Sequence, residues 1–248
     1  MALLIVAGAS PVAPFSKTFE KKAVTASAAL GDVVASGECG ENATWTLMQN
    51  NEDEENPTYT LTISGTGAME NYSPFRTSEI APWDSFKGSV ASVVIGDGVT
   101  SIGNSAFYKF TNLTSLSIAG TVTSIGDSAF ERCSSLANVT VPASVTSIGD
   151  FAFRCCTGLT SINIPDNVTR IGVDAFYQCT SLESLTIPES VTSIDRGVFN
   201  QDRNLTSLTY GGSAAEWAAL TGNVALGIPE GCMMIYLKKD VAIDGNIT

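Results

Sequence analysis

Three cysteines, Cys133, Cys156 and Cys179, recur at intervals of 23 residues. Equal spacing places them in one column if the chain coils once per interval, with neighbouring strands about 4.8 Å apart. An oxidised pair is geometrically possible at that separation, but three stacked members cannot all pair with one another. We interpret them as small buried apolar side chains, with the adjacent Cys155 pointing the other way. No CxxC pair occurs among the six cysteines, so they do not indicate a zinc site.

The groups that most often carry catalysis are missing or scattered. The chain has no histidine, which excludes Ser-His-Asp and Cys-His catalysis within it. Carboxylate chemistry remains, but no pattern places Glu38, Glu41 and Asp84 together. There is also no metal motif and no Gly-rich phosphate loop. The sequence therefore predicts a protein that is not an enzyme and has no cofactor and no metal site.

Three aspartates follow the turns of the expected coils, at Asp127, Asp150 and Asp174. Carboxylates of neighbouring coils could bind calcium between them. Aspartates at turns also accept hydrogen bonds from their own local backbone. We favour this second interpretation, in which each aspartate stabilises its own turn.

The elements that carry these residues follow from the same interval of 23. Phenylalanine, isoleucine and leucine each recur at fixed positions of the interval, and a short strict period of this kind is the signature of a solenoid. Each coil of a solenoid buries its core only against its neighbours. The phenylalanine column is Phe107, Phe130, Phe153, Phe176 and Phe199.

The segments on either side of the repeats break the period. Alternating apolar residues predict two strands, around Trp45 and around Leu61, joined as a hairpin by the acidic loop 49–57. A helical turn is expected at 82–88. After the last repeat, Ser213 is a plausible N-cap for a helix, and residues 232–237 predict a final strand.

The coil "L..L.I....VTSIG..AF..C..L" resembles the BspA-like, Treponema-type leucine-rich repeat over about residues 90–210, in five units. Phe110 and Asp202 stand where the other units have the repeating cysteine. The resemblance implies a β-rich, right-handed leucine-rich repeat solenoid with a parallel sheet on its concave side and short helical or 3-10 turns. With the flanking segments, we expect an N-terminal β-hairpin cap (31–88), the solenoid (89–212) and a C-terminal helix–strand cap (213–248).

Residues 1–30 precede these regions. An apolar stretch begins at Leu3, and Ala26-Ser27-Ala28 has the small-x-small form of a signal cleavage site. A basic n-region is missing. We expect a signal-like segment or an unstructured leader.

The resemblance also implies a function. Members of the family are typically secreted or surface proteins of bacteria, implicated in adhesion to host matrix proteins and to other microbes. The net charge of −12 argues against nucleic acid and anionic membranes as partners, and no segment is long enough to insert into a membrane. We expect an extracellular or cell-surface protein that binds another protein or a glycan. The alternative is a structural repeat spacer of a larger bacterial surface protein.

Binding would fall on the outward side of the concave strands, because alternate residues of a strand face opposite ways. Two neutral, polar columns result. The alternative is that these residues are ordinary solvated strand surface, since interfaces usually need aromatic or Arg anchors. Any affinity per contact should be weak, and multiple copies could compensate. One column is Ser115, Asn138, Ser161, Ser184 and Ser207; the other is Ser117, Thr140, Asn163, Thr186 and Thr209.

Overall fold

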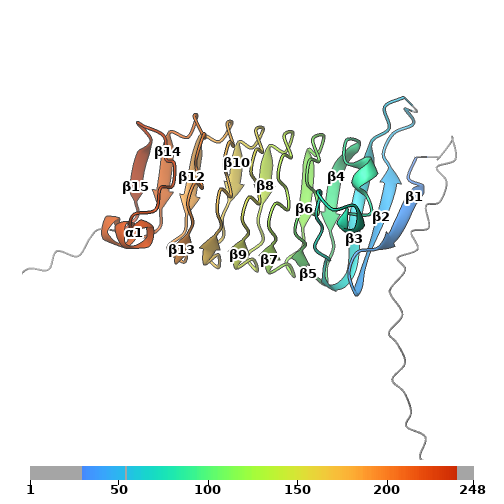
Figure 1. Ribbon diagram of the computed structural model, residues 1–248, viewed down its shortest axis with the longest axis horizontal. Coiled ribbons are helices and arrows are strands. Elements are labelled where there is room, and N and C mark those ends of the chain that lie inside the picture. Colours follow the sequence, from blue (N-terminus) through green and yellow to red (C-terminus); the bar gives the residue numbers. More distant parts are fainter. Residues whose placement is uncertain (1–29, 54, 239–248) are drawn as a thin grey trace, which may run out of the picture.

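The protein is an elongated stack of coils, running from β1 at one end to β15 at the other (Figure 1). A computed structural model describes residues 30–53 and 55–238. The signal-like or leader segment predicted for residues 1–30 lies, except for its last residue, outside the described residues. The expected solenoid is confirmed by two sets of short strands that repeat along the stack.

The first strand of each coil corresponds to the leucine-rich segment of the repeat. These strands pair in parallel as β4–β6, β8–β10 and β12–β14, and the ladder is interrupted between these pairs. In each strand the inward residues are the apolar ones, such as Val139 and Leu185. The strands are β4 (Val90–Ile95), β6 (Ser115–Ile118), β8 (Asn138–Thr140), β10 (Ser161–Asn163), β12 (Ser184–Ile187) and β14 (Ser207–Tyr210).

The second strand of each coil carries the repeated Val-Thr-Ser-Ile motif. These strands form an unbroken parallel ladder in the order β5-β7-β9-β11-β13. The sequence indicated that 122–125 is extended, but it did not reveal a second continuous sheet. The strands are β5 (Val99–Ile102), β7 (Ser124–Ile125), β9 (Ser147–Ile148), β11 (Arg170–Ile171) and β13 (Ser193–Ile194).

Successive turns close the third side of each coil. Ala106 N–H donates to Gly103 and Phe110 N–H to Phe107, three residues back, while Phe107 N–H donates to Ala129 of the next coil at 2.9 Å. Lys109 and its equivalents take left-handed backbone angles, with φ of 61° at Lys109. Side chains on this side therefore project from a backbone that is bonded both within the coil and to its neighbour.

The N-terminal end is more elaborate than a hairpin. The predicted hairpin is present as antiparallel β2 (Asn42–Gln49) and β3 (Tyr59–Ala68), but β1 (Val33–Glu38) adds a third strand beside β2. The long β3 pairs in parallel with β4 along its first part and with β5 at its end. It thus joins the cap to both strand ladders.

Two short 3-10 helices, η1 (Thr77–Glu79) and η2 (Asp84–Phe86), precede the first coil. Trp83 is fully buried beside η2, and its indole N–H donates to the Ala106 carbonyl at 2.8 Å. The helical turn expected at 82–88 is confirmed, and it supplies the aromatic side chain that covers the first coil.

The C-terminal end also follows the prediction. Helix α1 (Ala214–Thr221) begins with a capping box formed by Ser213 and Glu216. Strand β15 (Met233–Tyr236) pairs in parallel with β14. Within residues 30–53 and 55–238, no helix has the length and apolar character needed to cross a bilayer.

The phenylalanine column forms a stack along the centre of the solenoid. The ring centroids of successive residues lie 5.3–6.4 Å apart with interplanar angles of 6–15°, and Trp83 extends the stack beyond Phe107. All five phenylalanines are fully buried. Because a single coil cannot enclose these rings, the stack makes each coil depend on its neighbours.

The cysteine column runs beside this stack and is reduced. The thiols of Cys133, Cys156 and Cys179 each donate to a phenylalanine carbonyl 26 residues earlier, at 3.1–3.2 Å. Burial raises the pKa of all three thiols. All six cysteines are free. Interpretation of the column as small buried side chains is therefore confirmed, and Cys155 points outward and is partly exposed.

Asp202 occupies the next position of the cysteine column and is fully buried. Its Oδ1 accepts a hydrogen bond from the Cys179 N–H at 2.7 Å, while its Oδ2 is buried without a partner. Burial raises the pKa of this carboxyl to about 8, with the backbone hydrogen bond opposing the shift. The last coil thus contains an ionisable group at a position that is apolar elsewhere.

Candidate binding surfaces

The two predicted columns form an exposed strip along the first strands, here called the strand face. The pairs Ser161–Asn138 and Asn163–Thr140 lie in register across β10 and β8, as do Ser184–Ser207 and their neighbours across β12 and β14. Eight of the ten residues are exposed; Ser207 and Thr209 are half-buried. The structure brings the predicted residues together on one surface. Whether they bind a partner stays a prediction.

Part of the strand face is used to join coils. The Asn163 side chain accepts from the Val141 N–H at 2.8 Å and donates to the Val141 carbonyl at 3.2 Å. The Ser161 hydroxyl donates to Asn138 Oδ1 at 2.6 Å. Among the described residues, no such hydrogen bond ties down the Ser184 or Thr186 side chains. Ser184 and Thr186 therefore present exposed hydroxyl groups that are not used to join coils, as do Ser115, Ser117 and Thr140 among the described residues.

Apolar residues end both columns at the C-terminal end. Ser207 lies opposite Met233, and Thr209 lies opposite Ile235, across β14 and β15. At the other end, Ser117 lies opposite Val94 but Ser115 lies opposite Ser92. Met233 is 57% exposed. The sequence analysis missed the continuation through Met233 and Ile235 because the segment after the last repeat does not keep the interval of 23.

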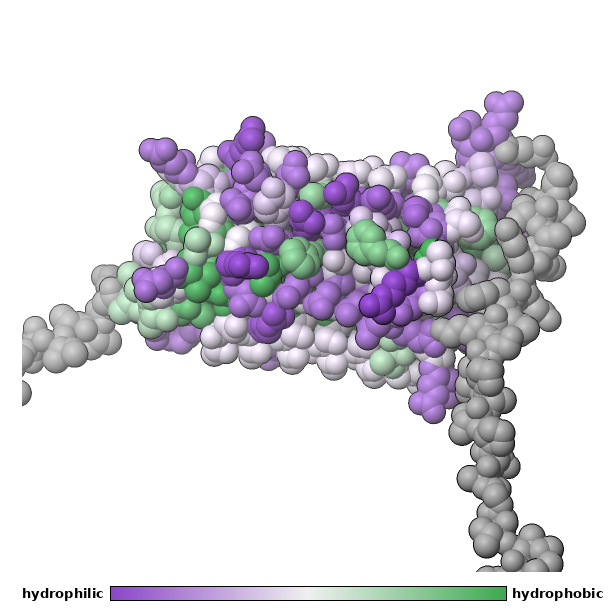
Figure 2. Space-filling view, in the orientation of Figure 1, coloured by the Kyte–Doolittle hydropathy of each residue, from purple (hydrophilic) through white to green (hydrophobic). Residues whose placement is uncertain are grey.

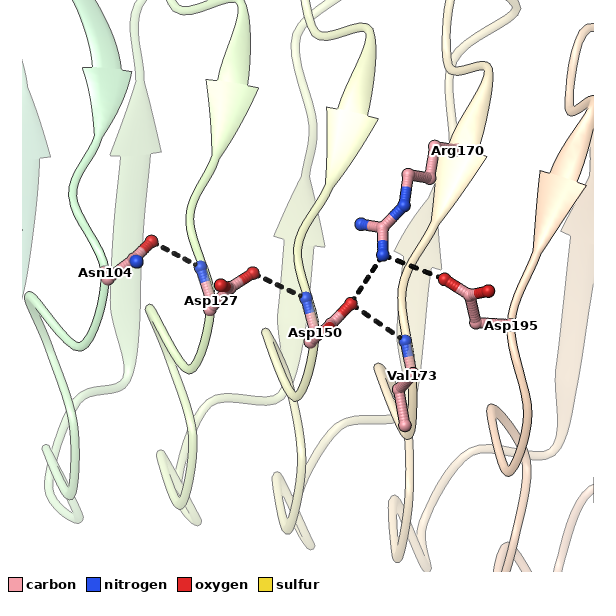
Figure 3. A network of polar contacts seen from close by, with 6 residues as sticks. All are labelled: Asn104, Asp127, Asp150, Arg170, Val173 and Asp195. Carbon is pink, nitrogen blue, oxygen red and sulfur yellow. Dashed lines mark hydrogen bonds and ion pairs between the residues drawn. The ribbon is translucent and has the colours of Figure 1, made fainter.

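The aspartates join neighbouring coils, and the interpretation that each bonds its own turn is wrong for Asp127 and Asp150. Figure 3 shows the ladder: Asn104 Oδ1 accepts from Asp127 N–H at 2.8 Å, Asp127 Oδ1 accepts from Asp150 N–H at 2.9 Å, and Asp150 Oδ1 accepts from Val173 N–H at 3.1 Å. The side chain reaches the next coil because equivalent residues are one strand spacing apart. Asp174 is one position out of this ladder.

Arg170 ends the ladder by contacting two carboxylates. Its Nη2 lies 2.7 Å from Asp150 Oδ1 and 2.8 Å from Asp195 Oδ2 (Figure 3). These contacts raise the pKa of the Arg170 guanidinium, chiefly through the hydrogen bond to Asp150. The aspartates are thus occupied by protein donors. In the described part of the chain, no cluster of three or more His, Cys, Asp or Glu side chains could hold a metal ion.

The turns on the third side carry a cluster that sequence analysis missed. Arg154 lies with its guanidinium carbon 5.6 Å from the centroid of the Phe151 ring and 5.1 Å from that of Tyr177. Its Nη1 is 3.2 Å from Glu131 Oε1, and Arg132 Nε is 3.7 Å from the same oxygen. We call Phe151, Arg154, Tyr177, Glu131 and Arg132 the turn cluster. The available signal was the mixture of charged and aromatic residues within two positions of each repeating Phe.

The surface therefore differs in character from place to place. In Figure 2, strongly hydrophilic and strongly hydrophobic residues intermingle along the middle of the face in view, whereas the lower border of the body is pale.

Cys155 lies beside the turn cluster, where its thiol donates to Gln178 Oε1 at 3.4 Å. Burial raises the pKa of this thiol, and Arg154 and Arg132 oppose the increase.

The repeats match a known family. The family profile described as "BspA type Leucine rich repeat region (6 copies)" matches residues 84–216. No curated protein matches the chain. The match covers more than half of the sequence, so it identifies the family.

Several solved leucine-rich repeat structures are similar to this chain. A leucine-rich repeat protein from Eubacterium ventriosum is 31% identical with a TM-score of 0.58, over 71% of this chain and 44% of that protein. The T. pallidum leucine-rich repeat protein is 25% identical with a TM-score of 0.50, over 75% and 89%. A leucine-rich cell surface protein from Faecalibacterium prausnitzii is 26% identical with a TM-score of 0.43, over 67% and 52%. The chain spans less than half the length of the E. ventriosum protein. From the match to its repeats, it belongs to the BspA-type leucine-rich repeat family.

Proposed function

We propose that this chain is a non-catalytic binding protein, secreted or held at a cell surface, that uses its strand face for adhesion. The partner would be an extracellular protein or a glycan. The observation that carries the proposal is the strand face itself, a strip of exposed Ser, Thr and Asn side chains held in register by parallel strands. The family resemblance supports the same location and role.

The surface chemistry suits many weak contacts. Hydroxyl and amide groups can donate and accept hydrogen bonds, but the strand columns contain no aromatic or arginine anchor of the kind that dominates strong interfaces. Several copies presented together would raise the apparent affinity without new contacts. We therefore expect weak binding by a single chain and much stronger binding by a multivalent one.

An array of matrix proteins and glycans, probed with the protein displayed in many copies on beads, tests the proposal. The strand-face variant Ser184→Glu/Thr186→Glu places charge where the hydroxyls are free, and should remove at least about 90% of the bound signal. Ser193→Glu is the control for an added charge on another face, to be compared with the single variant Thr186→Glu, because this exposed serine lies on β13 of the second ladder. Unchanged binding by the folded strand-face variant, or no binding by the wild type, would contradict the proposal.

A structural spacer is the second candidate. The continuous hydrogen-bonded ladder of β5 to β13 favours it, because such a stack holds its two ends at a fixed separation. The E. ventriosum protein extends well beyond the 44% of its length that this chain covers. Repeats of this kind can therefore form one segment of a larger protein. A spacer predicts that the strand-face variant leaves attachment of intact cells unchanged, whereas deletion of whole coils alters it.

A further inference from the structure

The turn cluster has the composition of a binding hot spot. Arginine and tyrosine are enriched among the residues that dominate the energy of protein interfaces. Here the Arg154 guanidinium lies near the rings of both Phe151 and Tyr177. The Arg154, Phe151 and Tyr177 side chains are partly exposed. These groups belong to the turns and not to the strands that carry the proposed adhesion surface.

Stacking of the coils does not account for these side chains. At the position of Arg154, the five coils carry Tyr108, Glu131, Arg154, Tyr177 and Asn200. At the next position they carry Lys109, Arg132, Cys155, Gln178 and Gln201. The backbone bonds between coils are the same in spite of this variety, since Lys109, Arg132 and Cys155 N–H groups all donate to the following coil. The fold therefore constrains the backbone conformation at these positions but not the type of side chain.

The backbone under the cluster is rigid. Lys109, Arg132 and Cys155 all have left-handed φ angles, between 58° and 65°, and their N–H groups are bonded at 2.7–2.8 Å. Side chains presented from a fixed backbone lose less entropy on binding than those on a loop that must be ordered. The side chains of the turn cluster are thus preorganised for binding.

The charge of the cluster selects the ligand. Arg132 and Arg154 share one carboxylate, Glu131, whose side chain is only 9% exposed and also accepts a hydrogen bond from Ser128 at 2.8 Å. Lys109 lies on the preceding coil, with its ammonium 5.2 Å from the Tyr108 ring centroid. The turn cluster itself has two arginines and one buried carboxylate, which leaves one positive charge in excess although the whole chain is acidic. A guanidinium group binds a carboxylate through charge-assisted hydrogen bonds.

We propose that the turn cluster binds an acidic segment of a partner protein, with Arg132 and Arg154 as the carboxylate anchors. A protein segment is favoured over an acidic glycan because Arg154 already lies against the Phe151 and Tyr177 rings, which reduces the ring surface available for stacking on a sugar. This surface is separate from the strand face, so the two proposals stand or fall independently.

Fluorescence anisotropy with a labelled twelve-residue peptide of Glu, Leu and Gly tests the proposal at about 0.15 M salt. Arg154→Gln and Arg132→Gln are each expected to weaken binding about tenfold. Lys238→Gln is the control, because it changes the net charge equally next to Glu189 at the C-terminal end. It should alter the affinity by less than about twofold. A matching peptide with Gln in place of Glu should not bind.

Glu131→Gln separates binding from folding. The variant keeps the shape of the side chain but removes the carboxylate that competes for both arginines, so the acidic peptide should bind several-fold more tightly. A damaged fold would weaken binding instead. The proposal is overturned if Glu131→Gln and Arg154→Gln, both folded by circular dichroism, leave the affinity unchanged. It is also overturned if heparin or a sialylated oligosaccharide binds the cluster more tightly than the peptide does.

Discussion

The strand face and the turns on the third side of each coil, here called the turn face, belong to the same coils. Both are hydrogen-bonded from coil to coil, yet their side chains differ. Columns on the strand face contain small neutral residues, and those on the turn face contain arginine, glutamate, tyrosine and phenylalanine. Side chains directly opposite each other across strands interact closely, so like charges there are destabilising. On the turn face, Glu131 lies between two arginines and aromatic rings flank Arg154. Regular stacking thus favours small neutral side chains on the strand face. On the turns it tolerates charged side chains that form ion pairs between coils.

The largest expected effect contrasts the inside of the turn with its outside. Phe153→Ala removes the central ring of the buried stack and should lower the free energy of unfolding by about 3–5 kcal/mol. Phe151→Ala, two residues earlier and partly exposed, should cost less than about 1 kcal/mol. Urea unfolding followed by circular dichroism measures both. Equal effects would mean that the turn face is as much a part of the core as the stack is.

The next effect concerns Asp202, the carboxylate residue at the cysteine-column position of the last coil. Folded Asp202 keeps its proton up to a pKa of about 8, whereas the unfolded chain loses it near the usual value for aspartate. The folded state therefore binds more protons between these values, and the free energy of unfolding should fall as pH rises from about 4 to about 8. One pKa unit corresponds to about 1.4 kcal/mol, so a shift of about four units sets an upper limit of about 6 kcal/mol for this group.

The variant Asp202→Cys restores the repeat and should remove this part of the pH dependence. It should also be more stable than the wild type at pH 8 and similar to it at pH 4. Thermal unfolding of both proteins across this pH range gives the difference. Parallel stability curves for the two proteins would show that Asp202 is not protonated when buried.

The smallest effect compares two residues of one column on the strand face. Asn163→Ala removes two hydrogen bonds to the Val141 backbone and should cost about 1–3 kcal/mol, because buried or half-buried backbone groups lose their partners. Thr186→Ala, at the equivalent position one coil later, should change stability by less than about 0.5 kcal/mol. Similar losses at the two sites would show that stacking, and not the amide contact, explains the presence of Asn163.

Much of the fold could be predicted because repetition makes the core visible. The columns of Phe107 and Cys133 follow from the interval of 23, and the N-cap at Ser213 follows from the local sequence. β1 was missed because its segment, VVASGE, has little regular alternation. The second ladder was missed because four of its five strands are only two residues long, so that pairing between coils defines it.

The surfaces were harder to predict than the core. The strand columns follow from alternation, but the use of Asn163 to join coils requires knowledge of where its amide points. The turn cluster unites Glu131, Arg154 and Tyr177 from three successive coils, and their side-chain directions depend on the left-handed angles around them. The Asp127–Asp150 ladder was misread for the same reason, since the direction of a short side chain at a turn decides whether it bonds its own coil or the next.

The phenylalanine stack has a consequence for how the chain folds. Because successive rings have nearly the same neighbours, a coil displaced by one repeat would meet a similar ring and lose little packing. Such displaced arrangements are competitors during folding, as in other repeat proteins. Within the buried core, the residues that distinguish them lie at the ends: Trp83 extends the stack before the first coil, and Asp202 and Trp217 lie at the last. The irregular residues at the two ends thus help to select the native register of the repeats during folding.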